Sequence, residues 1–383
     1  MLARGRAAWV CALLAAGVAG CTSSGSANSS VNVSGNVLRI YVSAASTDQP
    51  QVAQDVLDAE RLAFNQGPHT VGSFTIRMLT VRGSTLSEQA RTVIQDKTSI
   101  AYLGEIVPGS SAASLGITNA LDILQVSPTD TALELTETTP AVANAPDGYY
   151  ESLGSYGRTF ARVVPTSGDE AKAQIQEMQA LGVSKLYVTS DGSDYGRAIA
   201  NAVSHDVGGG ITLASSLAGA DGVFYGSASP AVAARFFNGA AGSNPSAKLF
   251  GPSALDAPRF VSALLTRVQN LYISTPGFLK PDLNSAGTAF VSQVTSTFGH
   301  APDAQAIFGY EAMAAVLSVL KEAGASANQR GTVVKDFFAI RNRESVLGTY
   351  SINSNGDTSI APFVFNRLKS GELVPFKFVS VSG

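Results

Sequence analysis

The residues of this chain best suited to metal or covalent chemistry are three histidines and two cysteines. His69, His205 and His300 lie far apart and lack the short spacing that places two side chains on one metal ion. Cys11 lies inside an apolar run near the N-terminus, and Cys21 lies just after that run. This pattern predicts surface histidines and no metal site.

The sequence also lacks motifs for nucleophilic or phosphate chemistry. It has no Gly-x-Ser-x-Gly elbow. Gly208-Gly209-Gly210 precedes the β-branched stretch 211–213, whereas a phosphate-binding loop precedes a helix, so we interpret it as a connecting turn. We therefore expect neither a cofactor nor an enzyme.

Cys21 ends a segment with the features of a secretory signal. Arg4 and Arg6 precede the apolar run 7–18, which is shorter than the roughly 20 residues that span a bilayer. The tetrapeptide Val18-Ala19-Gly20-Cys21 resembles the lipobox of bacterial lipoproteins, which implies that Cys21 is lipidated and becomes the mature N-terminus. The alternative is a plain signal peptide in which Cys21 is incidental. The predicted location is the extracytoplasmic side of the cell envelope, with a lipid anchor in the membrane.

The mature chain, without the signal at 1–20, has the composition of a globular protein behind a short linker. Residues 21–36 are expected to be a flexible tether, because 22–30 contain no bulky apolar side chain. Removal of the signal changes the formal charge from −3 to −5, so nucleic acid is not an expected partner. The 45% of apolar residues in a chain of 383 can build more than one core, which predicts two lobes.

Short apolar runs alternate with helical patterns along the chain. The predicted strands are 37–42, 74–81, 100–103, 123–126, 185–189, 222–225 and 248–250. The predicted helices are 51–65, 87–96, 110–120, 167–181, one from near 196, and 231–237. Ser167 and Glu170 have the spacing of a helix-starting capping box. The alternation predicts an α/β protein with doubly wound parallel sheets.

Several motifs occur in a fixed order. They are Gly104–Ser111, Ile123–Thr131, Asp194-Tyr195-Gly196, Phe308–Ala312 with Lys321–Gly324, and Gly348–Tyr350 with Asn355-Gly356-Asp357. Together they resemble the type I periplasmic binding proteins, and among these the branched-chain amino acid and amide receptors of ABC importers.

That resemblance implies two lobes joined by three crossings, near Val164, Thr275 and Asn355, with a hinge that closes on ligand. Lobe 1 is then 37–164 plus 276–355, and lobe 2 is 165–275 plus 356–383.

The resemblance also implies how lobe 1 binds ligand. Gly109, Ser110 and Ser111 hold the ligand carboxylate with amide and hydroxyl groups at a helix N-terminus. Pro108 stands where the family has a serine, and it offers neither an N–H nor a hydroxyl. An ordinary serine-rich helix cap is the alternative interpretation of this loop.

The same resemblance implies further ligand contacts. Thr129 and Thr131 supply a carbonyl and a hydroxyl, although a plain turn would explain them equally well. Tyr195 covers the ligand from lobe 2, with a surface tyrosine as the alternative. Ser253 stands where the family carries an acid for the ligand ammonium, and an aspartate at 191, 194 or 256 could replace that acid. A second family aromatic is replaced by Ala228.

These observations predict a monomeric solute-binding lipoprotein that delivers a small polar ligand, of the amino acid or amide class, to an ABC permease. A sensory receptor that uses the same cleft to signal to a membrane partner is the alternative. The sequence leaves both open.

Overall fold

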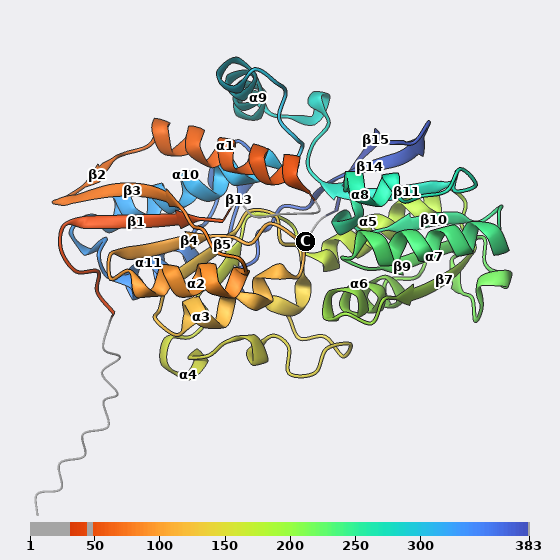
Figure 1. Cartoon of the computed structure of the whole chain (residues 1–383), viewed down its shortest axis with the longest axis horizontal. Helices are drawn as coiled ribbons and strands as arrows, with labels where there is room; N and C mark the ends of the chain where they lie inside the picture. The colour runs from red at the N-terminus through yellow and green to blue at the C-terminus, as the bar shows by residue number, and fades with distance from the viewer. Residues whose placement is uncertain (1–30, 44–48, 382–383) are drawn as a thin grey trace, which may run out of the picture.

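The computed structural model describes residues 31–43 and 49–381, which form two lobes (Figure 1). The predicted signal, Cys21 and the tether up to residue 30 lie outside the described residues. Lobe 1 is built on the sheet β2-β3-β1-β4-β5-β6. Its strands are β1 (Val37–Val42), β2 (Thr70–Val71), β3 (Phe74–Thr80), β4 (Ser99–Leu103), β5 (Leu124–Ser127) and β6 (Phe160–Arg162).

Lobe 2 is built on the sheet β15-β14-β11-β10-β9-β7-β8. Its strands are β7 (Lys185–Ser190), β8 (Thr212–Leu213), β9 (Gly222–Gly226), β10 (Lys248–Gly251), β11 (Leu271–Pro276), β14 (Pro362–Lys369) and β15 (Glu372–Ser380). The hairpin of β12 (Arg343–Ser345) and β13 (Gly348–Tyr350) stands apart from both sheets.

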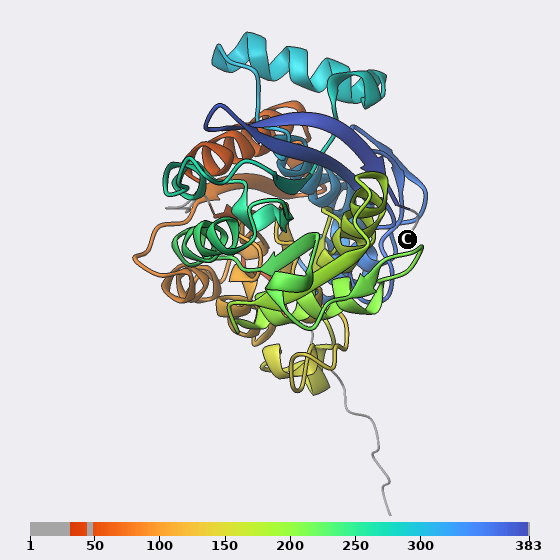
Figure 2. The same ribbon diagram turned by 90° about the vertical axis from the view of Figure 1, so that its right-hand side faces the viewer.

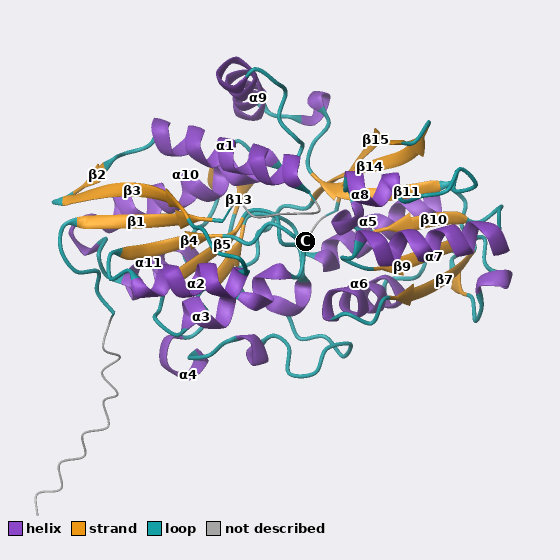
Figure 3. Cartoon of the chain, in the orientation of Figure 1, coloured by secondary structure: helices purple, strands orange, loops and turns teal. Residues whose placement is uncertain are grey.

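Helices cover both faces of the two sheets (Figure 3). In and around lobe 1 they are α1 (Pro50–Gln66), α2 (Leu86–Gln95), α3 (Leu115–Asn119), α4 (Leu153–Tyr156), α9 (Ser285–Phe298), α10 (Ala306–Ala323) and α11 (Arg330–Phe338). In lobe 2 they are α5 (Ser167–Ala180), α6 (Asp194–His205), α7 (Pro230–Ser243) and α8 (Pro258–Ser262). Short 3-10 turns include η1 (Ser110–Ala113), η2 (Leu133–Leu135) and η5 (Ser253–Leu255). This architecture confirms the predicted α/β class with two doubly wound sheets.

Each lobe has its own apolar core. In lobe 1, α1 and α10 pack on the sheet through side chains such as Leu57, Phe308 and Leu317. In lobe 2, Phe224 and Phe250 lie under α5 and α6, and Phe237 packs on the opposite face. Figure 2, seen from the lobe 2 side, shows α9 outside both layered bodies.

Strand order determines where each sheet can bind a ligand. In lobe 1, β1 pairs in parallel with β3 on one side and β4 on the other. In lobe 2, β7 pairs in the same way with β8 and β9. Connections leave in opposite directions at each of these points, which opens a crevice beyond the carboxyl ends of the strands. The loops after β4 and β7 therefore lie at the two switch points.

The chain passes from one sheet to the other at three places: between β6 and α5, between β11 and α9, and between β13 and β14. This is the three-crossing arrangement expected from the resemblance. The residue bounds proposed for the lobes stay a prediction.

Two local expectations are wrong. The helix expected over 110–120 divides into η1 and α3 at Ser114, whose φ of −119° departs from helical values, while its hydroxyl donates to the Ser111 carbonyl and accepts from Gln125 Nε2. The expected tether extends to residue 36, but Val33 is buried and its amide donates to the Asn328 carbonyl at 2.8 Å. The segment from residue 32 is therefore docked on lobe 1.

Candidate functional site

The loop after β4 turns sharply before η1. Gly109 adopts a left-handed φ of 83°, which favours glycine. Its amide donates to Asp130 Oδ1 at 2.6 Å, and the Ser111 amide donates to Asp130 Oδ2 at 2.8 Å. The Ser110 amide donates to the Val107 carbonyl at 2.9 Å. All three amides therefore have acceptors within the chain.

The loop after β5 lies directly beside it and contributes two buried threonines. The Thr129 hydroxyl donates to the Ile106 carbonyl at 2.6 Å. The Thr131 carbonyl accepts from the Ser167 amide at 2.5 Å, whereas the Thr131 hydroxyl has no hydrogen-bond partner in the described parts of the chain. The Thr131 hydroxyl, next to Tyr195, thus lacks a hydrogen bond of ordinary geometry.

Tyr195 reaches this loop from lobe 2. It lies in the first turn of α6, where the Ser193 side chain caps the helix by accepting from the Gly196 amide. Tyr195 is 3% exposed and packs over Gly109 so closely that a methyl group there would lie 3.1 Å from its Cβ. Burial raises the pKa of Tyr195, as does the Glu170 charge, while Thr131 and Ser253 oppose the shift. The hydroxyl makes no hydrogen bond of ordinary geometry within the described residues.

Glu170 on α5 lies at the carboxyl ends of β10 and β11. Its Oε1 accepts from the Ser253 amide at 2.6 Å and from the Ser274 hydroxyl at 2.5 Å, and its Oε2 accepts from the Ser253 hydroxyl at 3.0 Å. Burial raises the pKa of Glu170 to about 7, against the pull of these donors. A second buried acid, Glu134 in η2, has its pKa raised to about 8 by burial.

Direct contacts hold the two lobes together around this site. The Leu133 amide donates to Ser167 Oγ at 3.0 Å, and the Tyr149 hydroxyl donates to Asp194 Oδ2 at 3.0 Å. Leu133 and Val142 of lobe 1 pack with Ala198 of lobe 2 in one apolar cluster. The described conformation is therefore closed.

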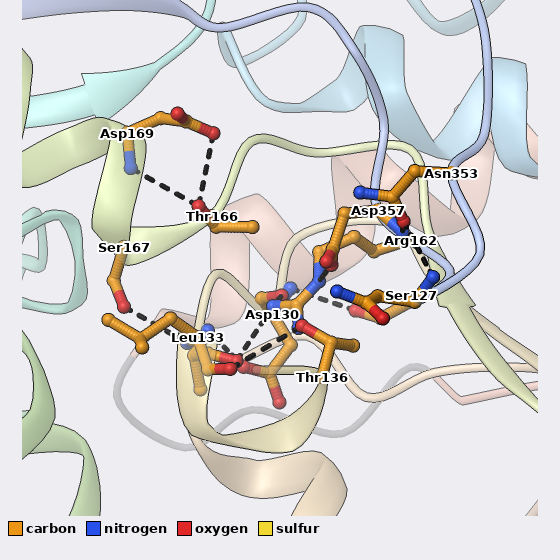
Figure 4. A network of polar contacts seen from close by, with 12 residues as sticks. Ser127, Asp130, Leu133, Thr136, Arg162, Thr166, Ser167, Asp169, Asn353 and Asp357 are labelled. Carbon is orange, nitrogen blue, oxygen red and sulfur yellow. Dashed lines mark hydrogen bonds and ion pairs between the residues drawn. The ribbon is translucent and has the colours of Figure 1, made fainter. Parts of the chain in front are cut away.

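A buried ion pair ties the first and third crossings. Arg162 Nε lies 2.8 Å from Asp357 Oδ1, with both side chains at most 3% exposed. The guanidinium also donates to the carbonyls of Asp130 and Ala132, each at 2.9 Å, and to Thr136 Oγ1 at 2.7 Å (Figure 4). Its charge and its donors are committed to the chain itself.

Comparisons with known proteins agree with this geometry. A family model described as periplasmic binding protein matches residues 212–372. The solved leucine binding protein LivK of Thermotoga maritima superimposes with a TM-score of 0.71 at 18% identity, over 89% of this chain and 98% of that one.

The fold is that of the type I periplasmic binding proteins. The LivJ substrate binding protein of Streptococcus pneumoniae, in complex with isoleucine, gives a TM-score of 0.69 at 15% identity, over 91% of this chain and 100% of that one. A Rhodopseudomonas palustris solute binding protein in complex with benzoate gives a TM-score of 0.65 at 17% identity, over 91% of this chain and 98% of that one. The comparison with curated proteins gives no match.

The type I fold brings the predicted site residues to one place. The loops of Gly109, Thr129 and Thr131 from lobe 1 meet Tyr195 from lobe 2, and Ser253 lies next to Glu170 behind Tyr195. Tyr195 is buried, so the alternative of a surface tyrosine is wrong. Whether these residues contact a ligand stays a prediction.

The acids suggested as replacements at position 253 have other roles. Asp194 is half exposed and pairs with Arg197 at 2.5 Å. Asp191 accepts from the hydroxyls of Ser193 and Ser227, and Asp256 accepts from the Thr275 hydroxyl. The acid that reaches Ser253 is Glu170.

The capping box expected from Ser167 and Glu170 is wrong. Thr166 caps α5 by accepting from the Asp169 amide at 3.1 Å, and the Glu170 carboxylate turns toward Ser253 instead. The spacing thus draws attention to Glu170, but the carboxyl group of this residue binds Ser253 rather than capping the helix. Sequence reasoning also misses Asp130, because its partners lie in a loop 19 or more residues away.

Metal and membrane signals are both absent from the described ranges. No group of three or more His, Cys, Asp or Glu side chains in residues 31–43 and 49–381 could hold a metal ion. The three histidines are all exposed. No helix in the same ranges combines the length and apolar character needed to cross a bilayer.

Proposed function

We propose that the chain is an extracytoplasmic solute-binding lipoprotein that closes on a small polar ligand and delivers it to an ABC permease. The observation that carries the proposal is the buried polar surface between the lobes, where the neighbouring hydroxyls of Tyr195 and Thr131 make no hydrogen bond of ordinary geometry among the described residues. Burying a polar group without a partner costs free energy, so such groups indicate a place where a ligand supplies the missing bond.

The solved structures of similar fold support this role. Their recorded ligands include isoleucine, leucine and benzoate, all small carboxylic acids. For this chain we propose only that a small polar ligand binds in the same interlobe position. We also propose that the protein acts as a monomer and needs no cofactor.

A thermal-shift screen of the purified protein with amino acids, amides, urea and carboxylates tests the proposal. A ligand at 100 times its dissociation constant stabilises a protein by about 2.7 kcal/mol. The shift should shrink in Tyr195→Ala and stay unchanged in Tyr187→Ala, which alters a tyrosine on β7. No shift with any compound, with the protein folded, would contradict the proposal.

Lipidation at Cys21 is tested separately. Palmitate should label the wild-type chain in cells and should not label Cys21→Ala. Equal incorporation in both would contradict the anchor without affecting ligand binding. Permease and ATPase genes beside this one would favour import, and a sensor kinase gene would favour signalling.

A further inference from the structure

The lobe 1 loop that the family resemblance assigns to a ligand carboxylate already holds a carboxylate. Asp130 Oδ1 and Oδ2 accept from the amides of Gly109 and Ser111, at 2.6 Å and 2.8 Å. The remaining candidate amide, Ser110, donates to the Val107 carbonyl. A ligand carboxylate at this place would have to displace Asp130 and would meet its negative charge.

Asp130 is held firmly in this position. Its side chain is fully buried, and Oδ1 accepts a further bond from the Ala132 amide at 3.1 Å. Arg162 holds the backbone at and after this residue through the carbonyls of Asp130 and Ala132 (Figure 4). Moving the side chain away would leave three amides without their acceptor, which is costly in a buried site.

The other polar groups around Tyr195 can all accept a hydrogen bond from a ligand, although the hydroxyls among them can also donate one. They are the hydroxyls of Tyr195 and Thr131 and the carboxyl groups of Glu170 and Glu134, and the Oε2 atom of Glu134 has no partner among the described residues. The buried Arg162 directs its nitrogens to two carbonyls, Thr136 and Asp357, although its charge partly offsets those of Asp130 and Glu134. Such surroundings suit a ligand that brings N–H donors and no negative charge.

We infer that Asp130 is a specificity-determining residue that fills the carboxylate position, so that the protein selects carboxylate-free ligands with N–H donors, such as amides, ureas or amines. This inference rests on the proposed function, since it assumes that the interlobe surface binds a solute. It narrows that function to one chemical class.

Matched pairs that differ only at the carboxyl group test the inference: acetamide and acetate, benzamide and benzoate, leucinamide and leucine. Calorimetric titration of the wild-type protein should show binding of amides and at least about tenfold weaker binding of the acids, a difference of about 1.4 kcal/mol. Asp130→Ala frees the amides of Gly109 and Ser111, so it should reverse this preference. Asp282→Ala, which removes an exposed aspartate, should leave it unchanged.

Asp130→Asn keeps a side-chain carbonyl for one amide while it removes the charge, and it serves if the alanine variant does not fold. It should weaken the preference for amides. Tight binding of the acids by the wild-type protein would overturn the inference and leave the proposed function standing. No binding of any pair member to any of the folded proteins would count against the proposed function and remove the inference with it.

Discussion

Two buried acids, one at the hinge and one at the edge of the cleft, differ in whether a cation lies beside them. Asp357, at the third crossing, lies against the Arg162 guanidinium. Glu170, at the cleft edge of lobe 2, is surrounded by serine hydroxyls and an amide, and no cation pairs with it in the described part of the chain. The first arrangement neutralises a charge inside the fold, and in the second the carboxyl group is held by hydrogen bonds alone, close enough to raise the pKa of Tyr195. The two acids therefore differ in whether the chain itself balances their charge.

The largest effect is expected from Arg162→Met, which tests the ion pair between Arg162 and Asp357. It leaves Asp357 buried without its cation and removes donors to three further acceptors, so we expect a loss of about 3–5 kcal/mol in the free energy of unfolding, measured by urea denaturation. Arg61→Ala removes an i,i+3 pair with a half-exposed arginine and should cost less than about 1 kcal/mol. Equal losses in both variants would show that the hinge pair is not structural.

The contact that brings Tyr195 to lobe 1 is tested by Gly109→Ala. The left-handed backbone costs roughly 1–2 kcal/mol for an alanine, and crowding against Tyr195 should add about 1 kcal/mol. Gly182→Ala is the matched control, since Gly182 has a φ of 74° and nothing within 4 Å of the added methyl group. Urea denaturation that gives the same loss for both variants would mean that Tyr195 does not pack on Gly109 in solution.

The environment of Glu170, which has no cation beside it in the described part of the chain, is tested by the pH dependence of the stability of Glu170→Gln. The pKa of Glu170 is raised from 4.5 to about 7 in the folded state, so the folded protein binds more protons than the unfolded chain between these values. Its contribution to stability is therefore full below about pH 4.5 and declines as the pH rises toward 7.

Glutamine keeps the shape and loses the charge. Glu170→Gln should thus equal the wild type near pH 4.5 and be more stable at pH 8, by on the order of 1–2 kcal/mol. Thermal unfolding at both pH values measures this difference. A constant difference at all pH values would show that folding does not raise the pKa of Glu170.

The smallest expected effect separates the two threonines of one loop. Thr129→Val removes a hydroxyl bonded to the Ile106 carbonyl and should cost about 1–1.5 kcal/mol. Thr131→Val removes a buried hydroxyl that makes no hydrogen bond of ordinary geometry among the described residues, so it should leave stability unchanged or raise it while it weakens ligand binding. The reverse order of stabilities in urea would contradict the division between structural and binding groups.

The sheets are predictable from the sequence for a simple reason. Strands such as Ser99–Leu103 are buried on both faces, so their apolar character is continuous and bounded by polar turns. The loops that end these strands are also predicted at the correct positions. Their hydrogen bonds are not, because Ser, Asp and Glu side chains have many local and distant partners of similar energy.

Asp130 and Glu170 show this limit. Asp130 stands between two threonines that the family resemblance assigns to the ligand, yet its own target is another loop. The spacing of Glu170 predicts a helix cap three residues away, whereas the side chain binds serines 83 and 104 positions further along the chain. Such pairings depend on how elements far apart in the sequence pack within each lobe, and a local sequence pattern does not predict that packing.

The Arg162 contact with Asp357 has a consequence for how the molecule matures. Arg162 is the last residue of β6 in lobe 1, whereas its partner Asp357 lies near the C-terminus. The ion pair therefore cannot form until nearly the whole chain has been synthesised. Until then the strand that leads into the first crossing contains an unmatched charge next to the core of lobe 1. Assembly of the first lobe should therefore wait for the C-terminal segment, and the two lobes should reach their final form in one cooperative step.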